Sequence, residues 1–393
     1  MTTSRAGRLL RKPEDPQQAT FLELFFDLAY VYVLAQLSQV LRQDLTWPGA
    51  FHTLVLLLAA WWVWCNTATV PDRFNPQRPA IQLLIIAALI GSLVMAVALP
   101  TAFGAQGLVF AGAYLAIQVG RSVVLLLALR GHESQRGAVR TLVWFGVSAV
   151  PWVAGALVHG TARKALWTLA VVLDYLAGKL RYPTPGLGRS PTSELPSAAE
   201  HLAERHRQFF IIALGELILV SASTFGGKGF APDRTTAFVV SIATTVLLWR
   251  IYIFRAGELS AAAIAGSSDP ARLGLSAFYA HLVMVAGVVV TAVGAELVIA
   301  HPSGHPQTAW TAVILGGPAL FLVGRARFEY AVFGRVSRDR PIGLLALAAL
   351  APVMLLVPPL LAALAASAVL AGVAISDTVH QRGRPPEPPS PPD

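Results

Sequence analysis

Residues 21–41 read FLELFFDLAYVYVLAQLSQVL, an apolar stretch that carries two carboxylates, Glu23 and Asp27. A stretch of this length can cross a bilayer, which takes about 17 to 25 mostly apolar residues. Similar runs follow along the whole chain of 393 residues. Their approximate starting points are Phe21, Phe51, Ala80, Leu108, Val139, Ala165, Phe209, Thr236, Leu273, Ala309, Ile342 and Leu361. The sequence therefore predicts an all-α polytopic membrane protein with about twelve transmembrane helices. Ten or eleven would result if the Ala165 run is re-entrant or if the two final runs form one hairpin.

Lys and Arg are distributed unevenly over the connections between these runs. If the N-terminus lies in the cytoplasm, the inward connections and termini hold 24 of the 30 basic residues and the outward connections hold 5. The remaining one, Arg121, lies inside a run. An excess of basic residues on cytoplasmic connections follows the positive-inside rule. We therefore expect a multi-pass protein with both termini in the cytoplasm.

Aromatic residues near the end of the second run indicate where the membrane surface lies. Trp61, Trp62 and Trp64 occur within four positions, and a Pro71-Asp-Arg-Phe-Asn-Pro segment follows them. Trp and Tyr are enriched at the interface between membrane and water. We therefore expect these indoles at the cytoplasmic membrane surface.

The composition excludes several classes of protein. Charged residues make up 13% of the chain, whereas soluble proteins contain about 25%. The net charge is +9, and we assign the excess of basic residues to cytoplasmic connections that meet anionic lipid headgroups. Membrane lipids are therefore expected partners, and nucleic acid is not. The single cysteine, Cys65, excludes an internal disulfide. Residues 1–18 are polar and basic and lack the apolar core of a cleavable signal peptide.

A long polar stretch after the sixth run divides the chain. An even number of spans in each half would give both halves the same orientation, as in a six-plus-six parallel repeat. Weak similarities between the halves leave internal duplication open. The expected parts are a basic cytoplasmic arm (1–19), a first membrane half of six helices (20–180), a cytoplasmic linker with an interfacial helix (181–206), a second membrane half of six helices (207–377) and a disordered proline-rich tail (378–393).

Ionisable residues inside apolar runs are the candidate functional groups, because burying them at membrane depth is costly. Asp27, Glu216 and Glu23 are the candidate catalytic or proton-binding carboxylates. The candidate ligand-binding residues are Arg121, Asp174, His281, His201, Glu204 and Arg205. With the expected topology, most of these groups lie toward the cytoplasmic side. We therefore expect a polar cavity that opens to the cytoplasm.

The spacing of Glu23 and Asp27 places both carboxylates on one helix face, one turn apart. Two such groups in a low dielectric repel each other when both are ionised, so one would retain a proton unless Arg121 or His281 supplied a counter-charge. The alternative is structural. In that interpretation the polar residues form hydrogen bonds between helices, and Glu23 interacts with the helix dipole.

The segment Glu200-His-Leu-Ala-Glu204-Arg205 is a second constellation. His201 and Glu204 share a helix face and could hold a metal in a helical bundle. The spacing is not the HExxH zinc motif, and most such segments are salt-bridged helix surfaces. We therefore expect no metal. Motifs for nucleotide or dinucleotide binding are absent as well, so no cofactor is expected.

The first run and several later blocks resemble the bacterial low temperature requirement protein A family, whose first helix carries an ELFFDL-type motif. The blocks are 21–38, Met95-Ala-Val-Ala-Leu-Pro, His201-Leu-Ala-Glu-Arg, Ile212-Ala-Leu-Gly-Glu, Tyr279-Ala-His-Leu, Gly294-Ala-Glu and Gly316-Gly-Pro-Ala-Leu. The family motif corresponds here to Glu23, Asp27, Glu204, Arg205, Gly215 and Glu216. Arg250 departs from the pattern, because an apolar group is expected after Trp249. The resemblance implies a polytopic protein of the bacterial inner membrane and assigns no molecular activity.

Three functions are compatible with these residues. The leading hypothesis is a transporter or permease-like protein that binds a small-molecule or lipid ligand together with a proton or cation. The first alternative is a membrane-embedded enzyme that performs acid–base chemistry on a lipid, polyprenyl or other hydrophobic substrate. The second is a non-catalytic membrane scaffold. The residues leave the ligand open, and they are compatible with a monomer or a homo-oligomer.

Overall fold

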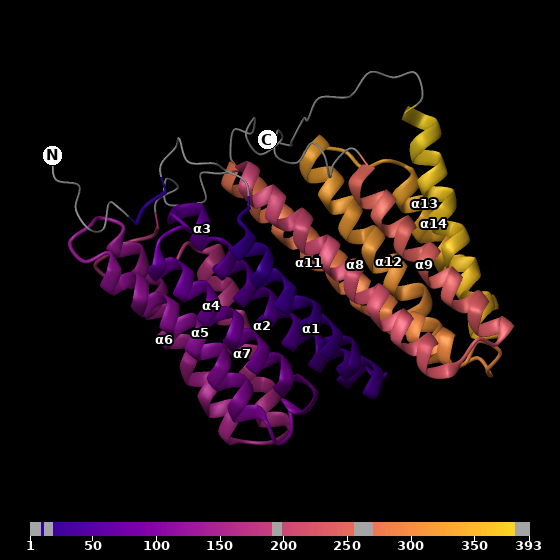
Figure 1. Cartoon of the computed structure of the whole chain (residues 1–393), viewed down its shortest axis with the longest axis horizontal. Helices are drawn as coiled ribbons and strands as arrows, with labels where there is room; N and C mark the ends of the chain where they lie inside the picture. The colour runs from indigo at the N-terminus through magenta and orange to yellow at the C-terminus, as the bar shows by residue number, and fades with distance from the viewer. Residues whose placement is uncertain (1–8, 12–18, 191–198, 255–269, 382–393) are drawn as a thin grey trace. The chain divides into compact units, whose positions relative to one another are not determined.

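The computed structural model describes residues 9–11, 19–190, 199–254 and 270–381, in which every regular element is a helix (Figure 1). The chain forms two compact units. Unit 1 comprises Met1–Val40 and Trp47–Leu202, and unit 2 comprises Leu41–Thr46 and Ala203–Asp393. The predicted all-α class is confirmed.

Unit 1 is a bundle of long helices joined by short connections. Its elements are α1 (Phe21–Gln43, of which the last three residues belong to unit 2), α2 (Trp47–Ala68), α3 (Val70–Arg73), α4 (Pro79–Ala98), the 3-10 turn η1 (Leu99–Thr101), α5 (Gly107–Ala128), α6 (Gln135–Leu157) and α7 (Gly160–Lys179). Helices α4 to α7 pack consecutively, and α2 packs on α4, α5 and α7 (Figure 1).

Unit 2 contains most of α8 and the helices that follow it. The elements are α8 (Ala199–Lys228, of which the first four residues belong to unit 1), α9 (Pro232–Tyr252), α11 (Pro270–Ala300), α12 (Thr308–Phe333), α13 (Asp339–Met354) and α14 (Pro359–Gln381). Helix α11 packs most extensively on α12, and α9 packs on α11 and α14. The expected interfacial helix is continuous with the span that follows it, because both are part of the single 30-residue helix α8.

Ten helices in the described part of the chain are long and apolar enough to cross a membrane. Two of the expected runs, which correspond to α7 and α13, do not meet these criteria of length and composition. Helix α13 has only 16 residues. Helix α7 has 20 residues, about 30 Å, but carries four charged side chains: Arg163, Lys164, Asp174 and Lys179.

Helix α7 nevertheless runs the full length of unit 1. At its start, Arg163 donates hydrogen bonds to the carbonyls of Ala102 and Gly104, in the connection before α5. Beyond its end, the carbonyl of Leu187 accepts a hydrogen bond from Arg140 in the second turn of α6. The Ala165 run is therefore part of one continuous helix of 20 residues.

Large aromatic side chains fill the core of unit 1. Trp152 and Trp167 are fully buried, and their ring centroids lie 5.4 Å apart. Trp61, Trp62 and Trp64 are buried as well. The three indoles that were expected at the membrane surface are therefore covered by other side chains of the unit, with Trp62 against Tyr175 of α7.

Candidate functional site

Helix α1 begins with a capping box. The backbone N–H and hydroxyl of Thr20 donate to Glu23 Oε1 at 3.0 Å and 2.9 Å, and the backbone N–H of Glu23 lies 3.4 Å from Thr20 Oγ1. This reciprocal arrangement satisfies backbone donors that a helix N-terminus otherwise leaves unpaired. The Thr-x-x-Glu spacing is visible in the sequence, but the sequence analysis did not identify it.

The second oxygen of the Glu23 carboxylate binds His201 at the start of α8. Glu23 Oε2 lies 2.8 Å from His201 Nε2, and Asp72 Oδ1 binds the opposite ring nitrogen, Nδ1. All three side chains are buried. Burial by itself would lower the pKa of His201, but hydrogen bonds to Asp72 and Glu23, and the charges of both carboxylates, raise it to about 9. His201 is therefore a buried cation at neutral pH, paired with two carboxylates.

Asp72 is held in place by a short segment near the N-terminus. The backbone N–H of Arg11 donates to the carbonyl of Arg73 at 2.9 Å, and that of Asn75 donates to the carbonyl of Leu9 at 2.8 Å. Arg11 Nη1 also donates to the carbonyl of Pro71. The sequence analysis missed Asp72. The only local signal was an acidic residue in the proline-bounded segment directly after the second apolar run.

The Glu23–His201–Asp72 group does not have the geometry of a metal site. The two imidazole nitrogens point in opposite directions, so the two carboxylates that they bind cannot converge on one ion. In the part of the chain that the structure describes, no group of three or more His, Cys, Asp or Glu residues is arranged to hold a metal.

Asp27 lies one turn further along α1 and is fully buried. The indole N–H of Trp64 donates to Asp27 Oδ1 at 2.8 Å. Tyr30 continues the same face of α1 and donates to the carbonyl of Ala60 at 3.3 Å. Glu23 thus binds Thr20 and His201, and Asp27 binds Trp64, although their spacing suggested a directly coupled pair.

Helix α5 contributes a second polar face to the core of unit 1. Tyr114, Gln118 and Arg121 follow the i, i+4, i+7 spacing and are all buried. Arg121 Nη2 donates to Gln118 Oε1 at 2.5 Å, and Arg121 Nη1 lies 3.4 Å from Thr67 Oγ1. Arg121 also lies over the ring of Phe145. Among the residues that the structure describes, Arg121 forms no ion pair with a carboxylate.

Asp174 of α7 joins this face from the opposite side. The hydroxyl of Tyr114 donates to Asp174 Oδ2 at 2.6 Å, and the indole N–H of Trp152 donates to the same oxygen at 3.3 Å. Tyr114 thus connects the polar face of α5 to Asp174. Helices α1, α5 and α7 each place charged side chains in the interior of unit 1.

In unit 2 the remaining candidates occupy α8 and α11. The side-chain amide of Gln208 connects Glu204 with Arg205, because Gln208 Nε2 donates to Glu204 at 3.0 Å and Gln208 Oε1 accepts from Arg205 at 3.2 Å. Glu216 is fully buried.

His281 has a partner on each ring nitrogen. Its Nδ1 lies 2.8 Å from the carbonyl oxygen of Ala277, and its Nε2 lies 3.0 Å from the hydroxyl of Tyr252. A carbonyl can only accept, so Nδ1 carries a hydrogen, and Nε2 can accept from Tyr252. This arrangement suits a neutral imidazole.

A charged cluster in unit 2 was not anticipated. Arg340 binds Glu329 at 3.3 Å and Asp377 at 2.8 Å, and all three side chains are buried. Arg325 is also buried and donates to the carbonyls of Ile251 and Phe254 at the end of α9. The sequence analysis treated these arginines only as topology signals, because the run of basic residues near the end of the tenth apolar run looked like a cytoplasmic connection.

The structure brings together Glu23 and His201 among the predicted site residues. Asp27 belongs to unit 1 and Glu216 to unit 2, so the predicted convergence of these two carboxylates stays a prediction. Each unit by itself nevertheless contains buried charged groups within long apolar helices. This combination of apolar helices and buried charges defines a polytopic α-helical membrane protein with a polar interior.

Comparison with known proteins identifies the family. Residues 18–375 match the family described as Bacterial low temperature requirement A protein (LtrA), and the chain belongs to this family. An uncharacterized protein of Rhizobium meliloti (strain 1021) is 38% identical over 331 residues, which cover 82% of this chain and 80% of the relative. No solved structure matches the chain. The resemblance noted from the sequence motifs is confirmed.

Proposed function

We propose that this LtrA-family protein is a transporter of the permease type, in which buried carboxylates bind a coupling proton or cation. In this proposal it lies in the bacterial inner membrane with both termini in the cytoplasm. Asp27 and Glu216 are the coupling carboxylates. The transported solute is a small molecule or lipid.

The burial of Asp27 is the observation that carries the proposal. Asp27 is fully buried within an apolar helix, where an ionised carboxylate is expensive and a purely structural role could be filled by an apolar side chain. Trp64 donates a hydrogen bond to Asp27 Oδ1, which orients the carboxylate. Such a group can exchange a proton or a cation as its surroundings change.

Arg121 provides the counter-charge in this proposal. Its hydrogen-bond partners among the described residues are neutral, and both Arg121 and Asp27 are buried inside unit 1. When Asp27 loses its proton, the guanidinium of Arg121 can compensate the negative charge within unit 1. Glu23 has a positioning role, because Thr20 and His201 both bind it.

Proton flux into proteoliposomes tests the proposal. Vesicles that contain the full chain and a trapped pH indicator are given a potassium diffusion potential, and acidification is recorded with and without a panel of candidate solutes. We expect solute-dependent flux that Asp27→Asn abolishes. The matched control is Asp44→Asn, in the connection between α1 and α2, where the carboxylate accepts a hydrogen bond from Thr46. Equal flux in wild type and Asp27→Asn would contradict the proposal.

A further inference from the structure

A pocket of about 400 Å³ lies where two connections of unit 1 meet the start of α6. Its wall is formed by Gly131, His132, Glu133, Gln135, Arg136, Val139 and Leu187. This volume lies within the range of small-ligand sites. No residue of the candidate transport site lines it.

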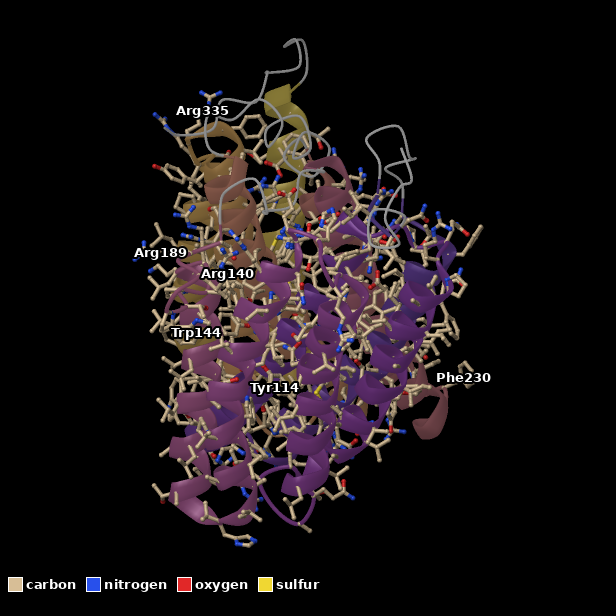
Figure 2. The ribbon with its side chains drawn as sticks, turned by 90° about the vertical axis from the view of Figure 1, so that its left-hand side faces the viewer. Tyr114, Arg140, Trp144, Arg189, Phe230 and Arg335 are labelled. Carbon is tan, nitrogen blue, oxygen red and sulfur yellow. The ribbon has the colours of Figure 1, made fainter. Side chains whose placement is uncertain are left out.

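The pocket is built by ordered loops. Arg140, a buried residue of α6, donates from Nη2 to the carbonyl of Leu187 at 2.9 Å, and Trp144 donates from its indole to the carbonyl of Pro183 at 2.9 Å. Figure 2 shows Arg140, Trp144 and Arg189 on this side of unit 1. The two hydrogen bonds hold the 183–187 loop against α6.

The sharp turn after α7 directs this loop toward α6. Arg181 and Tyr182 have φ angles of 60° and 51°, in the left-handed region that residues with a Cβ rarely occupy. The backbone N–H of Tyr182 donates to the carbonyl of Ala177 at 2.8 Å and stabilises this conformation. Hydrogen bonds therefore hold the loop at both ends, and Leu187 is a fixed part of the pocket wall.

The pocket offers donors to an anion. The backbone N–H of Ser134 donates to His132 Nδ1 at 3.2 Å, so in a neutral ring the hydrogen is on Nε2, which remains a donor. Gln135 uses its oxygen to accept from the backbone N–H of Gly131, which leaves its amide hydrogens available. Arg136 adds an exposed guanidinium.

The charge around the pocket is strongly positive. Exposed Arg130 and Arg189 and buried Arg140 belong to the same connections or helix as the pocket wall, which also contains Arg136. Glu133 is the single acidic residue in the wall. An anionic group therefore fits the pocket better than a cationic one.

An exposed apolar stripe of α6 continues directly from the pocket. Arg136 and Val139 share a helix face with Val143, Val147, Val150 and Leu157, because these positions recur at spacings of three, four and seven residues. Val150 and Leu157 are 68% and 64% exposed. From Val143 to Leu157 the stripe is about 21 Å long at 1.5 Å per residue. The acyl chain of a membrane lipid can therefore lie along this stripe over most of the acyl chain's length.

We propose that this pocket binds the phosphate of an anionic phospholipid, whose acyl chain lies along the exposed stripe of α6. Basic pockets at the ends of transmembrane helices bind acidic lipid headgroups by this combination of charge and hydrogen bonding. The ligand is a membrane component in this proposal, and the site is separate from the transport pathway.

Native mass spectrometry of the full chain in detergent tests the proposal without any transport assay. The protein is titrated with dioleoyl phosphatidylglycerol, with dioleoyl phosphatidylcholine and with inorganic phosphate. We expect preferential retention of phosphatidylglycerol, and about fivefold weaker binding in Arg136→Gln, because one arginine near a charged headgroup contributes about 1 kcal/mol. Inorganic phosphate is not expected to displace the lipid.

Arg78→Gln is the matched control. Arg78 is an exposed arginine just before α4 and does not line the pocket. Its replacement removes the same charge and is expected to leave lipid retention unchanged. Equal retention by wild type and Arg136→Gln, equal losses in both variants, no preference over phosphatidylcholine, or displacement by inorganic phosphate would each overturn the proposal.

Discussion

Glu23 Oε2 lies 2.8 Å from His201 Nε2 and thereby joins the first turn of α1 to the first turn of α8. Asp72 binds the other face of the same imidazole. Three points that are distant in the sequence thus meet at one end of unit 1. Removing one side chain from a buried charged group of this kind destabilises the fold, because the charges that remain are buried and less well compensated.

The stability of the protein should fall at alkaline pH. The pKa of His201 rises from its ordinary value near 6.5 to about 9 on folding, so its contribution is fully present below about pH 6.5 and is lost as the pH rises through 9. We expect the melting temperature in detergent to decline between pH 7 and about 9.5. His201→Gln should reduce this slope, and an unchanged slope in that variant would contradict the assignment.

Loss of the capping box should destabilise the start of α1. Thr20→Ala removes the hydroxyl that donates to Glu23 and accepts from its backbone N–H, which should cost about 1 kcal/mol. Thr20→Ser keeps the hydroxyl and is the matched control. Thermal unfolding of both variants provides the measurement, and equal losses in the two would show that the hydroxyl is not responsible.

Gly107 at the start of α5 should not tolerate a side chain. A Cβ there would lie 2.7 Å from Arg163 Nη1, and this guanidinium cannot move freely because the carbonyls of Ala102 and Gly155 bind it. We expect Gly107→Ala to cost about 1–3 kcal/mol. In the same helix, Gly120 has open space around its Cβ position. A melting temperature of Gly107→Ala equal to that of Gly120→Ala would contradict this prediction.

The close contact between α11 and α12 should tolerate an added side chain even less well. A Cβ at Gly287 would lie 2.5 Å from the backbone nitrogen of Phe321, and backbone atoms of a packed helix cannot yield as a side chain can. We expect Gly287→Ala to lose at least about 2 kcal/mol. Gly316→Ala, whose Cβ position is open, is the control on α12. Both variants can be compared by their melting temperature and by the yield of folded protein.

Much of the fold was predictable because hydropathy and charge are local properties that can be counted along the chain. The long runs predicted helices at the right places, and the motif around Glu23 and Asp27 pointed to the correct family. The run near Ala165 was one of those left ambiguous. Its charges are satisfied by partners such as the carbonyl of Ala102 and the hydroxyl of Tyr114, which a hydropathy sum does not contain.

The candidate site was only partly predictable. Burial cost singled out Asp27, Arg121 and Asp174 as unusual, but it did not indicate what each would bind. Trp64 was interpreted as an interfacial residue, yet its indole is buried and bound to Asp27. The difference arises because a tryptophan near a helix end can face lipid or protein, and only the rotation of the helix within the bundle distinguishes the two.

Helix positions and membrane character thus followed from the order of residues, since each depends on a short window of sequence. The pairing of polar groups did not, because it joins side chains such as Asp72 and His201 that are 129 positions apart. Whether such groups meet depends on how the intervening helices pack and which face each helix turns inward. Those choices are made by the packed bundle as a whole, where buried polar and charged groups need hydrogen-bonding or oppositely charged partners.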